Sequence, residues 1–443
     1  MAWLGDDFTG AAAVMEVLAF HGVPAVLFLD TPTATQIAQF PPDASVGIAS
    51  MARTRSPAWM DAHLPDAFAA LQATGAGLLH YKVCSTLDSA PHSGSIGRAL
   101  EIGAGLTGAQ VVPIVVAAPQ MRRYQVFGHL FAGTPQGVFR LDRHPVMSQH
   151  PVTPMTESDV AAHLRQQTTL PIDCLDIEGL HDPAARARAM SAKPRPRGLT
   201  VDMMGADDEA AAGCLMWDAR AANPFVIGSQ GVEYALVQHL RQIGVLADPP
   251  SIGGTGHADR MAVVSGSVSP VTAAQIAWSQ ANGFATIPFR AAAVCGSASG
   301  LAQAEHDSII AALAALEKGQ VPLIFTAAGP QDPAVAVLRA AATGMEMADV
   351  NDRIGAALGR MLRSLVDRAD LTRVVASGGD TSGHVCQALD IFALTALAPT
   401  IPGAAICLAH ATGATDGLEV ALKGGQMGSE NYFGWVRDGG GAR

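Results

Sequence analysis

The sequence predicts an α/β protein of two domains, each with a mostly parallel sheet flanked by helices. Short apolar runs recur along the chain and alternate with Ala-rich stretches of helical composition. This alternation is typical of buried parallel strands joined by crossover helices. The 443 residues exceed the usual size of one domain, and a Pro-, Gly- and Ser-rich stretch at 247–259 divides the pattern in two. We therefore expect domains at 1–248 and 260–443, with the active site in the cleft between them.

Each half of the chain supplies its own series of elements. In the first half, strands are expected at 24–29, 46–49, 77–81, 111–117, 198–202 and 225–228, with helices at 10–21, 57–74 and 96–103. In the second half, strands are expected at 261–265, 285–288, 322–326, 373–376 and 404–408, with helices at 272–282, 300–319 and 354–370. Residues 131–154 are rich in Pro, His and Gly without a clear period, so we expect a long and functional loop there.

Composition and charge exclude several classes of protein. Hydrophobic residues make up 49% of the chain and charged residues only 15%, which argues against disorder. The formal net charge of −11 disfavours a dedicated nucleic-acid binder, which needs a surplus of Lys and Arg. The apolar runs are shorter than the roughly 20 residues that span a bilayer. We therefore expect small-molecule partners, without nucleic acid or membrane, and leave a homodimer open.

Cysteine and histidine usage favours a cytoplasmic protein. The six cysteines are sparse and form no Cys-x-x-Cys pair, as expected of reduced thiols. The N-terminus has no basic region followed by an apolar core, so a secretory signal is not expected. The histidines show no His-x-x-x-His or His-Glu-x-x-His pattern, and we expect no structural metal site.

Two adjacent carboxylates, Asp6 and Asp7, stand at a turn between a short apolar entry and the first expected helix. Such a pair could orient a polyhydroxy substrate, with one carboxylate as a base. The alternative is structural, because Asp7 or Thr9 could cap the helix. The residues alone leave both interpretations open.

A second polar cluster follows the expected strand 77–81. Lys82, Ser85 and Thr86 place one cation and hydroxyl groups at a carboxyl strand end. This composition suits a ligand with a carboxylate and several hydroxyls. The alternative is an ordinary polar turn with a solvated Lys82.

The second half holds three Gly- and Ser-rich loops near expected strand ends, at 264–270, 375–384 and 422–428. Small residues there let backbone N–H groups approach an anion. The middle loop also carries Asp380, which could hold Mg²⁺ or its water shell. None matches a standard nucleotide fingerprint, and one loop alone would be read as a turn. Three together favour a nucleotide site, whose candidate residues are Ser267, Gly378, Gly379, Asp380, Thr381, Gly383, Gly425 and Gln426.

The motifs, in this order, resemble the four-carbon acid sugar kinase family. The similar segments are Gly5–Ala11, Lys82–Thr86, Gly94–Gly97, Gly128–Phe131, His150–Met155, Ser265–Ser267, Gly378–Thr381 and Leu422–Gly428. The resemblance implies an N-terminal domain that binds a tetronate-type acid and a C-terminal domain that binds ATP. Cys84 and Asp88 stand where many members carry Asp and Arg. This form is similar to the 3-oxo-tetronate kinase branch, which phosphorylates the terminal hydroxyl.

We therefore expect a cytoplasmic kinase that uses ATP and Mg²⁺ to phosphorylate 3-oxo-tetronate, threonate or erythronate, at the terminal 4-hydroxyl. The expected substrate-binding residues are Asp6, Asp7, Arg53, Lys82, Ser85 and Thr86. Asp7 and Asp380 are the candidate catalytic residues, and Asp380 is the candidate metal ligand.

Two other functions stay open. The first is a different sugar-acid enzyme, such as an aldolase or isomerase, although no Schiff-base lysine environment or metal triad is evident. The second is a protein that binds a sugar acid or a nucleotide without turnover. Departures from the family pattern at Gly424, Gln426 and Met427 leave that second alternative open.

Overall fold

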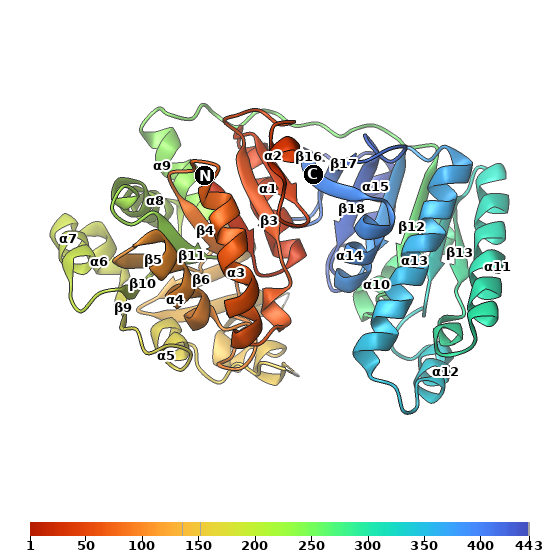
Figure 1. Cartoon of the computed structure of the whole chain (residues 1–443), viewed down its shortest axis with the longest axis horizontal. Coiled ribbons are helices and arrows are strands. Elements are labelled where there is room, and N and C mark those ends of the chain that lie inside the picture. The colour runs from red at the N-terminus through yellow and green to blue at the C-terminus, as the bar shows by residue number, and fades with distance from the viewer. Residues whose placement is uncertain (135, 151, 442–443) are drawn as a thin grey trace. The chain divides into compact units, whose positions relative to one another are not determined.

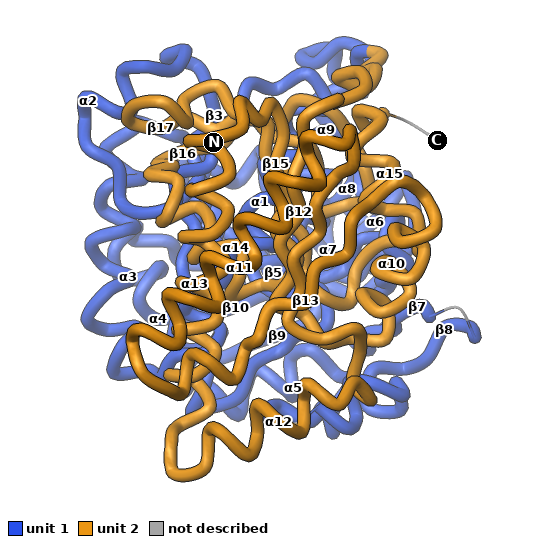
Figure 2. Tube along the Cα trace, turned by 90° about the vertical axis from the view of Figure 1, so that its right-hand side faces the viewer, with its two compact units in different colours: residues 1–250 blue, residues 251–443 orange. Residues whose placement is uncertain are grey.

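A computed structural model describes residues 1–134, 136–150 and 152–441. The chain divides into two compact units, Met1–Pro250 and Ser251–Arg443, which Figure 2 colours separately. The boundary falls inside the Pro/Gly/Ser-rich stretch. Which ligand each of the two expected domains binds remains a prediction. Among the described residues, no helix is both long and apolar enough to cross a membrane.

Unit 1 is built on eight parallel strands in the order β2-β3-β1-β4-β11-β5-β10-β9. Their bounds are β1 Ala2–Gly5, β2 Ala25–Phe28, β3 Ser45–Ala49, β4 Leu79–Lys82, β5 Val111–Val115, β9 Ile172–Leu175, β10 Arg197–Val201 and β11 Phe225–Gly228. A separate antiparallel sheet is formed by β6 Arg123–Val126, β7 His129–Thr134 and β8 Gly137–Arg140. The expected parallel sheet is thus confirmed.

Helices cover both faces of the unit 1 sheet (Figure 1). They are α1 Phe8–Phe20, α2 Ala34–Ile37, α3 Pro57–Gln72, α4 Ile96–Thr107, α5 Val160–Arg165, α6 Ile177–His181, α7 Pro183–Ser191, α8 Ala206–Ala219 and α9 Gly231–Gln242. Apolar residues of α8 and α9 pack on Val226 and its neighbours on one face. Phe225, the preceding residue, meets Phe68 of α3 on the other face. Successive strand residues point to opposite faces, so a run buried on both sides needs a helix layer on each.

Unit 2 has the strand order β13-β14-β12-β15-β18-β17-β16. The bounds are β12 Met261–Ser265, β13 Phe284–Pro288, β14 Val321–Phe325, β15 Arg373–Ser377, β16 Ile391–Ala398, β17 Ile406–Ala411 and β18 Glu419–Lys423. The first five strands in that order are parallel, whereas β17 runs antiparallel to both β18 and β16. The sheet is therefore mixed, as suits an α/β domain that adds antiparallel strands at one edge.

The helices of unit 2 are α10 Pro270–Ala281, α11 Ala298–Glu317, α12 Pro333–Ala341, α13 Met347–Ala369, α14 Gly379–Ala388 and α15 Tyr432–Arg437. One face of the sheet packs against α10 and α15 through a core that includes Ile276, Tyr432 and Phe433. On the other side, α13 packs against α11, α14 and β12. This unit thus has its own apolar core.

The structure adds strands that the sequence analysis did not predict, namely β1, β6, β7, β8, β9, β16 and β18. The expected loop at 131–154 is partly wrong, because β7 and β8 occupy much of its first half. Residues 135 and 151 of that segment lie outside the described part of the chain. The antiparallel β6–β8 sheet has no strong alternation of apolar residues, since most of its side chains are only half-buried.

Candidate active site

Three neighbouring strands of unit 1 bring the predicted substrate residues together. Strand β1 lies between β3 and β4 in the sheet. Asp6 and Asp7 follow β1, Arg53 lies in a short 3₁₀ helix at Ala52–Thr54 after β3, and Lys82 closes β4. Because the strands are parallel, these residues share the carboxyl edge of the sheet, where open α/β sheets bind ligands.

The Arg53 guanidinium joins the two carboxylates. Its Nε and Nη2 donate to Asp6 at 3.1 and 2.6 Å, and its Nη1 and Nη2 donate to Asp7 at 2.7 Å each. A guanidinium has five N–H donors in a fixed plane, so one donor on Nη1 is left over among the described residues. The side chain of Arg53 is 18% exposed and that of Asp6 only 3%. The cluster is therefore a rigid, mostly buried ion triad.

Asp7 also caps helix α1. Its Oδ1 accepts from the Gly10 N–H at 2.8 Å, and its Oδ2 accepts from Thr9 Oγ1 at 2.7 Å. The helix-cap interpretation of the turn is thus confirmed. The same carboxylate also binds Arg53. Asp7 therefore caps the helix and belongs to the candidate site at the same time.

Lys82 is buried, and the alternative of a solvated lysine is wrong. The residue is 2% exposed, and its Nζ donates to the Val83 carbonyl at 2.7 Å. The lysine reaches the two-carboxylate turn because position 10 is glycine. A Cβ at that position would lie 2.9 Å from Lys82 Nζ and closer still to Asp7. A methyl group there would push the ammonium out of the cluster.

The electrostatics separate the two carboxylates. Burial raises the pKa of Asp6 above its ordinary value, and the charge of Asp7 adds to this although Arg53 opposes it. Burial acts the same way on Asp7, but Arg53, Lys82 and the hydrogen bonds from Thr9 and Gly10 outweigh it and lower its pKa. The surroundings of Asp7 therefore favour its ionised form. Those of Asp6 shift it toward its protonated form.

The loop after β4 holds the remaining predicted substrate residues and one that sequence reasoning missed. Ser85 and Thr86 are 9% and 8% exposed, and the Thr86 hydroxyl lies 3.1 Å from Cys84 Sγ. Cys84 in turn is within electrostatic range of both Arg53 and Arg123. Arg123 lies after β5 at the same edge of the sheet. The sequence feature that could have pointed to Arg123 is the pair of adjacent arginines, Arg122 and Arg123, which follows an apolar run.

Arg123 differs from Arg53 in having no carboxylate partner among the described residues. Its Nη1 donates to the carbonyls of Met121, Arg122 and Gly133, while its Nε is buried without a hydrogen bond. Burial lowers the pKa of Arg123 below its ordinary value. A half-buried cationic group with an unused, buried donor is suited to an anion.

In unit 2, the three predicted loops follow the adjacent parallel strands β12, β15 and β18. Backbone hydrogen bonds continue past the strand ends, from the Gly266 N–H to Ser377 and from the Gly378 N–H to Lys423. A Cβ on Gly425 would collide with Ser267 Oγ, and one on Gly378 would lie 2.8 Å from Thr381 Oγ1. The structure thus brings the three loops together.

The N-terminus of α14 suits a phosphate group. Helices α10, α11 and α12 each begin with a Ser or Asp side-chain cap, whereas α14 begins at Gly378 with none, as do α13 and α15 at their own N-caps. The first N–H groups of α14 therefore have no side-chain acceptor, and a helix N-terminus attracts anions. Asp380 lies in this first turn and is exposed, as are Gly379, Gly383 and Gln426. An exposed carboxylate beside such donors fits a metal ion bound together with phosphates.

Lys423 is a buried cation behind these loops that the sequence analysis did not select. It is 0% exposed, and its Nζ donates to the Gly424 carbonyl at 3.0 Å. The register aligns Ser265, Ser377 and Lys423 across the three strand ends. The hydroxyls of both serines are buried and make no hydrogen bond within the described residues. Burial lowers the pKa of Lys423 to about 8.

We expect Lys423 to make the stability of unit 2 depend on pH. Below pH 8 the folded state holds a buried ammonium, whereas between pH 8 and 10.5 only the unfolded chain keeps that proton. The free energy of unfolding of the wild type should therefore rise across this range, by up to about 3 kcal/mol, relative to Lys423→Met. Denaturant titrations at several pH values measure this. Lys318→Met, at an exposed position, should follow the wild type, and parallel curves for wild type and Lys423→Met would contradict the expectation.

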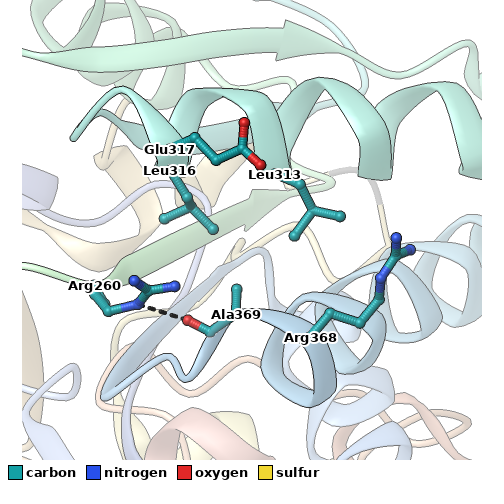
Figure 3. A pocket seen from close by; sticks show the side chains of 6 residues that line it. All are labelled: Arg260, Leu313, Leu316, Glu317, Arg368 and Ala369. Carbon is teal, nitrogen blue, oxygen red and sulfur yellow. Dashed lines mark hydrogen bonds between the residues drawn. The ribbon is translucent and has the colours of Figure 1, made fainter.

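The pocket drawn in Figure 3 lies away from these residues. It is lined by Arg260, Leu313, Leu316, Glu317, Arg368 and Ala369. Arg260 directly precedes β12, so the pocket is at the amino edge of the sheet, opposite the three loops. Arg260 donates to the Ala369 carbonyl at 2.7 Å. None of the predicted site residues lines it.

Comparisons with known proteins match both halves of the chain. Residues 1–236 match a family model described as a sugar-binding N-terminal domain, and residues 262–433 match one described as a nucleotide-binding C-terminal domain. A 3-oxo-isoapionate kinase of Paraburkholderia graminis is 45% identical, over 99% of this chain and 94% of the relative. The chain belongs to the four-carbon acid sugar kinase family. This membership makes it a sugar-acid kinase and confirms the resemblance that its motifs indicated.

Other members of the four-carbon acid sugar kinase family support the same placement. A 3-oxo-tetronate kinase of Burkholderia multivorans is 30% identical, over 97% of this chain and 95% of the relative. A crystal structure from Salmonella typhimurium LT2, provisionally described as a tRNA synthase, has a TM-score of 0.78 and 25% identity, covering 98% of each chain. The full-length superposition confirms the two-domain α/β fold.

Proposed function

We propose that this kinase transfers the γ-phosphoryl group of ATP to the terminal hydroxyl of a 3-oxo sugar acid. The observation that carries the proposal is the 45% identity to a 3-oxo-isoapionate kinase over nearly the whole chain. The next relative, at 30%, acts on a 3-oxo-tetronate by its name. Both names share an oxo group at position 3 and a carboxylate. We therefore place 3-oxo-isoapionate first and 3-oxo-tetronate second as candidate substrates, ahead of threonate and erythronate.

In this proposal, residues 1–248 bind the acid through the carboxyl edge of β3, β1 and β4. Arg53 spends four of its five donors on Asp6 and Asp7, so its main role is to hold the two carboxylates in place. Asp6, which accepts only two hydrogen bonds from Arg53, then receives a substrate hydroxyl, and Asp7 keeps the cluster in place. Lys82 and Arg123, with the hydroxyls of Ser85 and Thr86, hold the acid's carboxylate and keto oxygen. Arg123 would replace the cation that the family pattern places at position 88.

Residues 260–443 bind ATP in the same proposal. The three loops after β12, β15 and β18 and the uncapped start of α14 would hold its phosphates. Asp380 would hold Mg²⁺, which neutralises charge on the phosphates during transfer. Direct transfer also requires the acid and the nucleotide to be brought together during the reaction.

The proposed reaction is tested by ADP release from the purified full chain with a panel of acids. We expect Mg²⁺-dependent turnover with kcat/KM highest for a 3-oxo acid, and lower by at least tenfold for threonate and erythronate. Equal rates for the oxidised and reduced acids would overturn the substrate assignment. Binding of acid and ATP by calorimetry without any ADP release would instead favour a binding protein without turnover.

Lys82→Met should raise KM for the sugar acid while leaving ATP affinity unchanged. The loss of a charge-assisted hydrogen bond to an ionised group costs about 1.5–3 kcal/mol, or roughly 10- to 100-fold in affinity. Methionine keeps the length of the buried side chain, so the fold should persist. Calorimetry with each ligand separately makes the measurement. A loss of ATP binding with retained acid binding would show that the two domains were assigned the wrong ligands.

Arg123→Gln should also weaken acid binding, by roughly 10- to 100-fold. The neighbouring Arg122 is exposed and supplies the matched control, because Arg122→Gln removes the same charge from the adjacent position. We expect the acid's KM to change only in the first variant. Equal effects of both substitutions would mean that Arg123 acts only through the overall charge.

A further inference from the structure

Helices α8 and α9 place three potential metal ligands together outside the kinase site. Cys214 and Asp218 stand four residues apart on α8 and therefore on one face of the helix. His239 faces them from α9, and one ligand atom of each residue lies within 4.8 Å of the other two. The two helices pack side by side in unit 1 (Figure 1). Their close approach depends on Gly213, where a Cβ would lie 2.7 Å from His239 Cβ.

A second observation concerns the polar groups of this cluster. His239 is 7% exposed, and its ring makes no hydrogen bond to any described residue. The Cys214 Sγ donates to Asp218 Oδ2 at 3.3 Å. A buried imidazole normally has a partner for its nitrogens, and here the atoms that it approaches are a thiol and a carboxylate. Asp218 is exposed, so the cluster has an entry path from solvent.

The surrounding charge also favours a cation. Asp218 and His239 lie in the last turns of α8 and α9, where unpaired backbone carbonyls carry about half a negative charge per helix. The positive charge of the nearby Arg186 partly opposes this attraction. The helices end at the amino edge of the strands, since α8 leads into β11. The cluster is thus separate from Asp6, Asp7 and Arg53 at the carboxyl edge.

We propose that Cys214, Asp218 and His239 bind one Zn²⁺ ion that links α8 to α9. A thiolate, an imidazole and a carboxylate are the ligands that zinc takes, at about 2.0–2.3 Å each, which places ligand atoms about 3.5 Å apart. The ligand atoms lie within 4.8 Å of one another, so they would have to move closer together to coordinate the ion. Binding forms a zinc–sulfur bond and releases the Cys214 proton to solvent, and water completes the fourth position. The ion strengthens the helix pair and takes no part in phosphoryl transfer.

The experiment titrates Zn²⁺ into the full, metal-stripped chain by calorimetry, and Co²⁺ with absorption spectroscopy. The wild type should bind one Zn²⁺ per chain, raise its melting temperature on binding, and show a thiolate-to-cobalt charge-transfer band. Cys214→Ser should abolish that band, and Asp218→Asn and His239→Gln should each weaken Zn²⁺ binding at least tenfold. Cys174→Ser, which removes another cysteine of unit 1, should behave as the wild type.

Two results would overturn the proposal. One is the absence of saturable one-to-one Zn²⁺ binding by the wild type. The other is binding that survives in Asp218→Asn and Cys214→Ser but is lost in Cys174→Ser, which would place the ion elsewhere. Because Asp218 is exposed, its variant keeps the test valid even if His239→Gln were to unfold.

Discussion

Arg53→Leu should reduce kcat/KM for the sugar acid by at least about 1000-fold and destabilise unit 1. The substitution removes four charge-assisted hydrogen bonds at once and leaves Asp6 and Asp7 facing each other without a cation between them. Breaking a buried ion pair by removing one partner costs about 3–5 kcal/mol in the free energy of unfolding. ADP release and denaturant unfolding measure the two effects.

Arg55→Leu is the matched control for this prediction. Arg55 is exposed two residues further along and contacts Met51 and the Trp59 ring rather than a carboxylate. Its loss should leave kcat/KM and the free energy of unfolding near wild-type values. If Arg53→Leu also kept wild-type kcat/KM, the triad would be structural, and the acid site would have to lie elsewhere.

Asp380→Asn should lower kcat by about 100- to 1000-fold and change the Kd of ATP by less than about threefold. A group that organises charge around the transferred phosphoryl group acts mainly in the transition state, and its loss is comparable to that of one oxyanion donor. The side chain is exposed in the first turn of α14, so the fold should be unaffected. Steady-state ADP release and calorimetry with ATP separate kcat from binding.

Asp349→Asn provides a control of the same chemistry, because Asp349 is also an exposed acid in the first turn of a unit 2 helix. It should not alter kcat. An unchanged kcat and kcat/KM in Asp380→Asn would remove Asp380 from the mechanism. A large loss of ATP binding would instead assign it to the ground-state nucleotide site.

Most strands that the sequence analysis predicted are buried along their whole length and read as continuous apolar runs, although β13 and β17 are only partly buried. Strand β9 was missed because two of its four residues, Asp173 and Cys174, are exposed at the sheet edge. Strand β18 was missed because it begins and ends with charged residues, Glu419 and Lys423, although Lys423 is fully buried. Local pattern cannot distinguish a charge at a solvent-exposed end from one that tertiary packing encloses.

The same limit applies to the candidate site. Asp6, Asp7 and Lys82 were selected from their local patterns, whereas the parallel pairing of β1 with β4, which brings them together, is seen only in the structure. Arg53 was expected among the substrate-binding residues, and its position after β3 explains how it reaches Asp6 and Asp7 after β1. Arg123 and His239 are different, because the partners that make them notable come from distant elements. Only the packing of the β6–β8 sheet and of α8 on α9 brings those side chains to their neighbours.

The saturated hydrogen bonding of Asp7 has a consequence for the timing of proton transfer. Its two oxygens already accept from Arg53 twice, from Thr9 and from Gly10, which fills the roughly four lone-pair positions of a carboxylate. While this network stands, Asp7 has no position left to receive the proton of a substrate hydroxyl. In the proposed kinase Asp7 would therefore take no proton from the alcohol before the phosphoryl group has largely left its donor, as a loose transition state permits. Catalysis at this centre would then be governed by alignment of the attacking oxygen, and any transfer of its proton to Asp7 would come last.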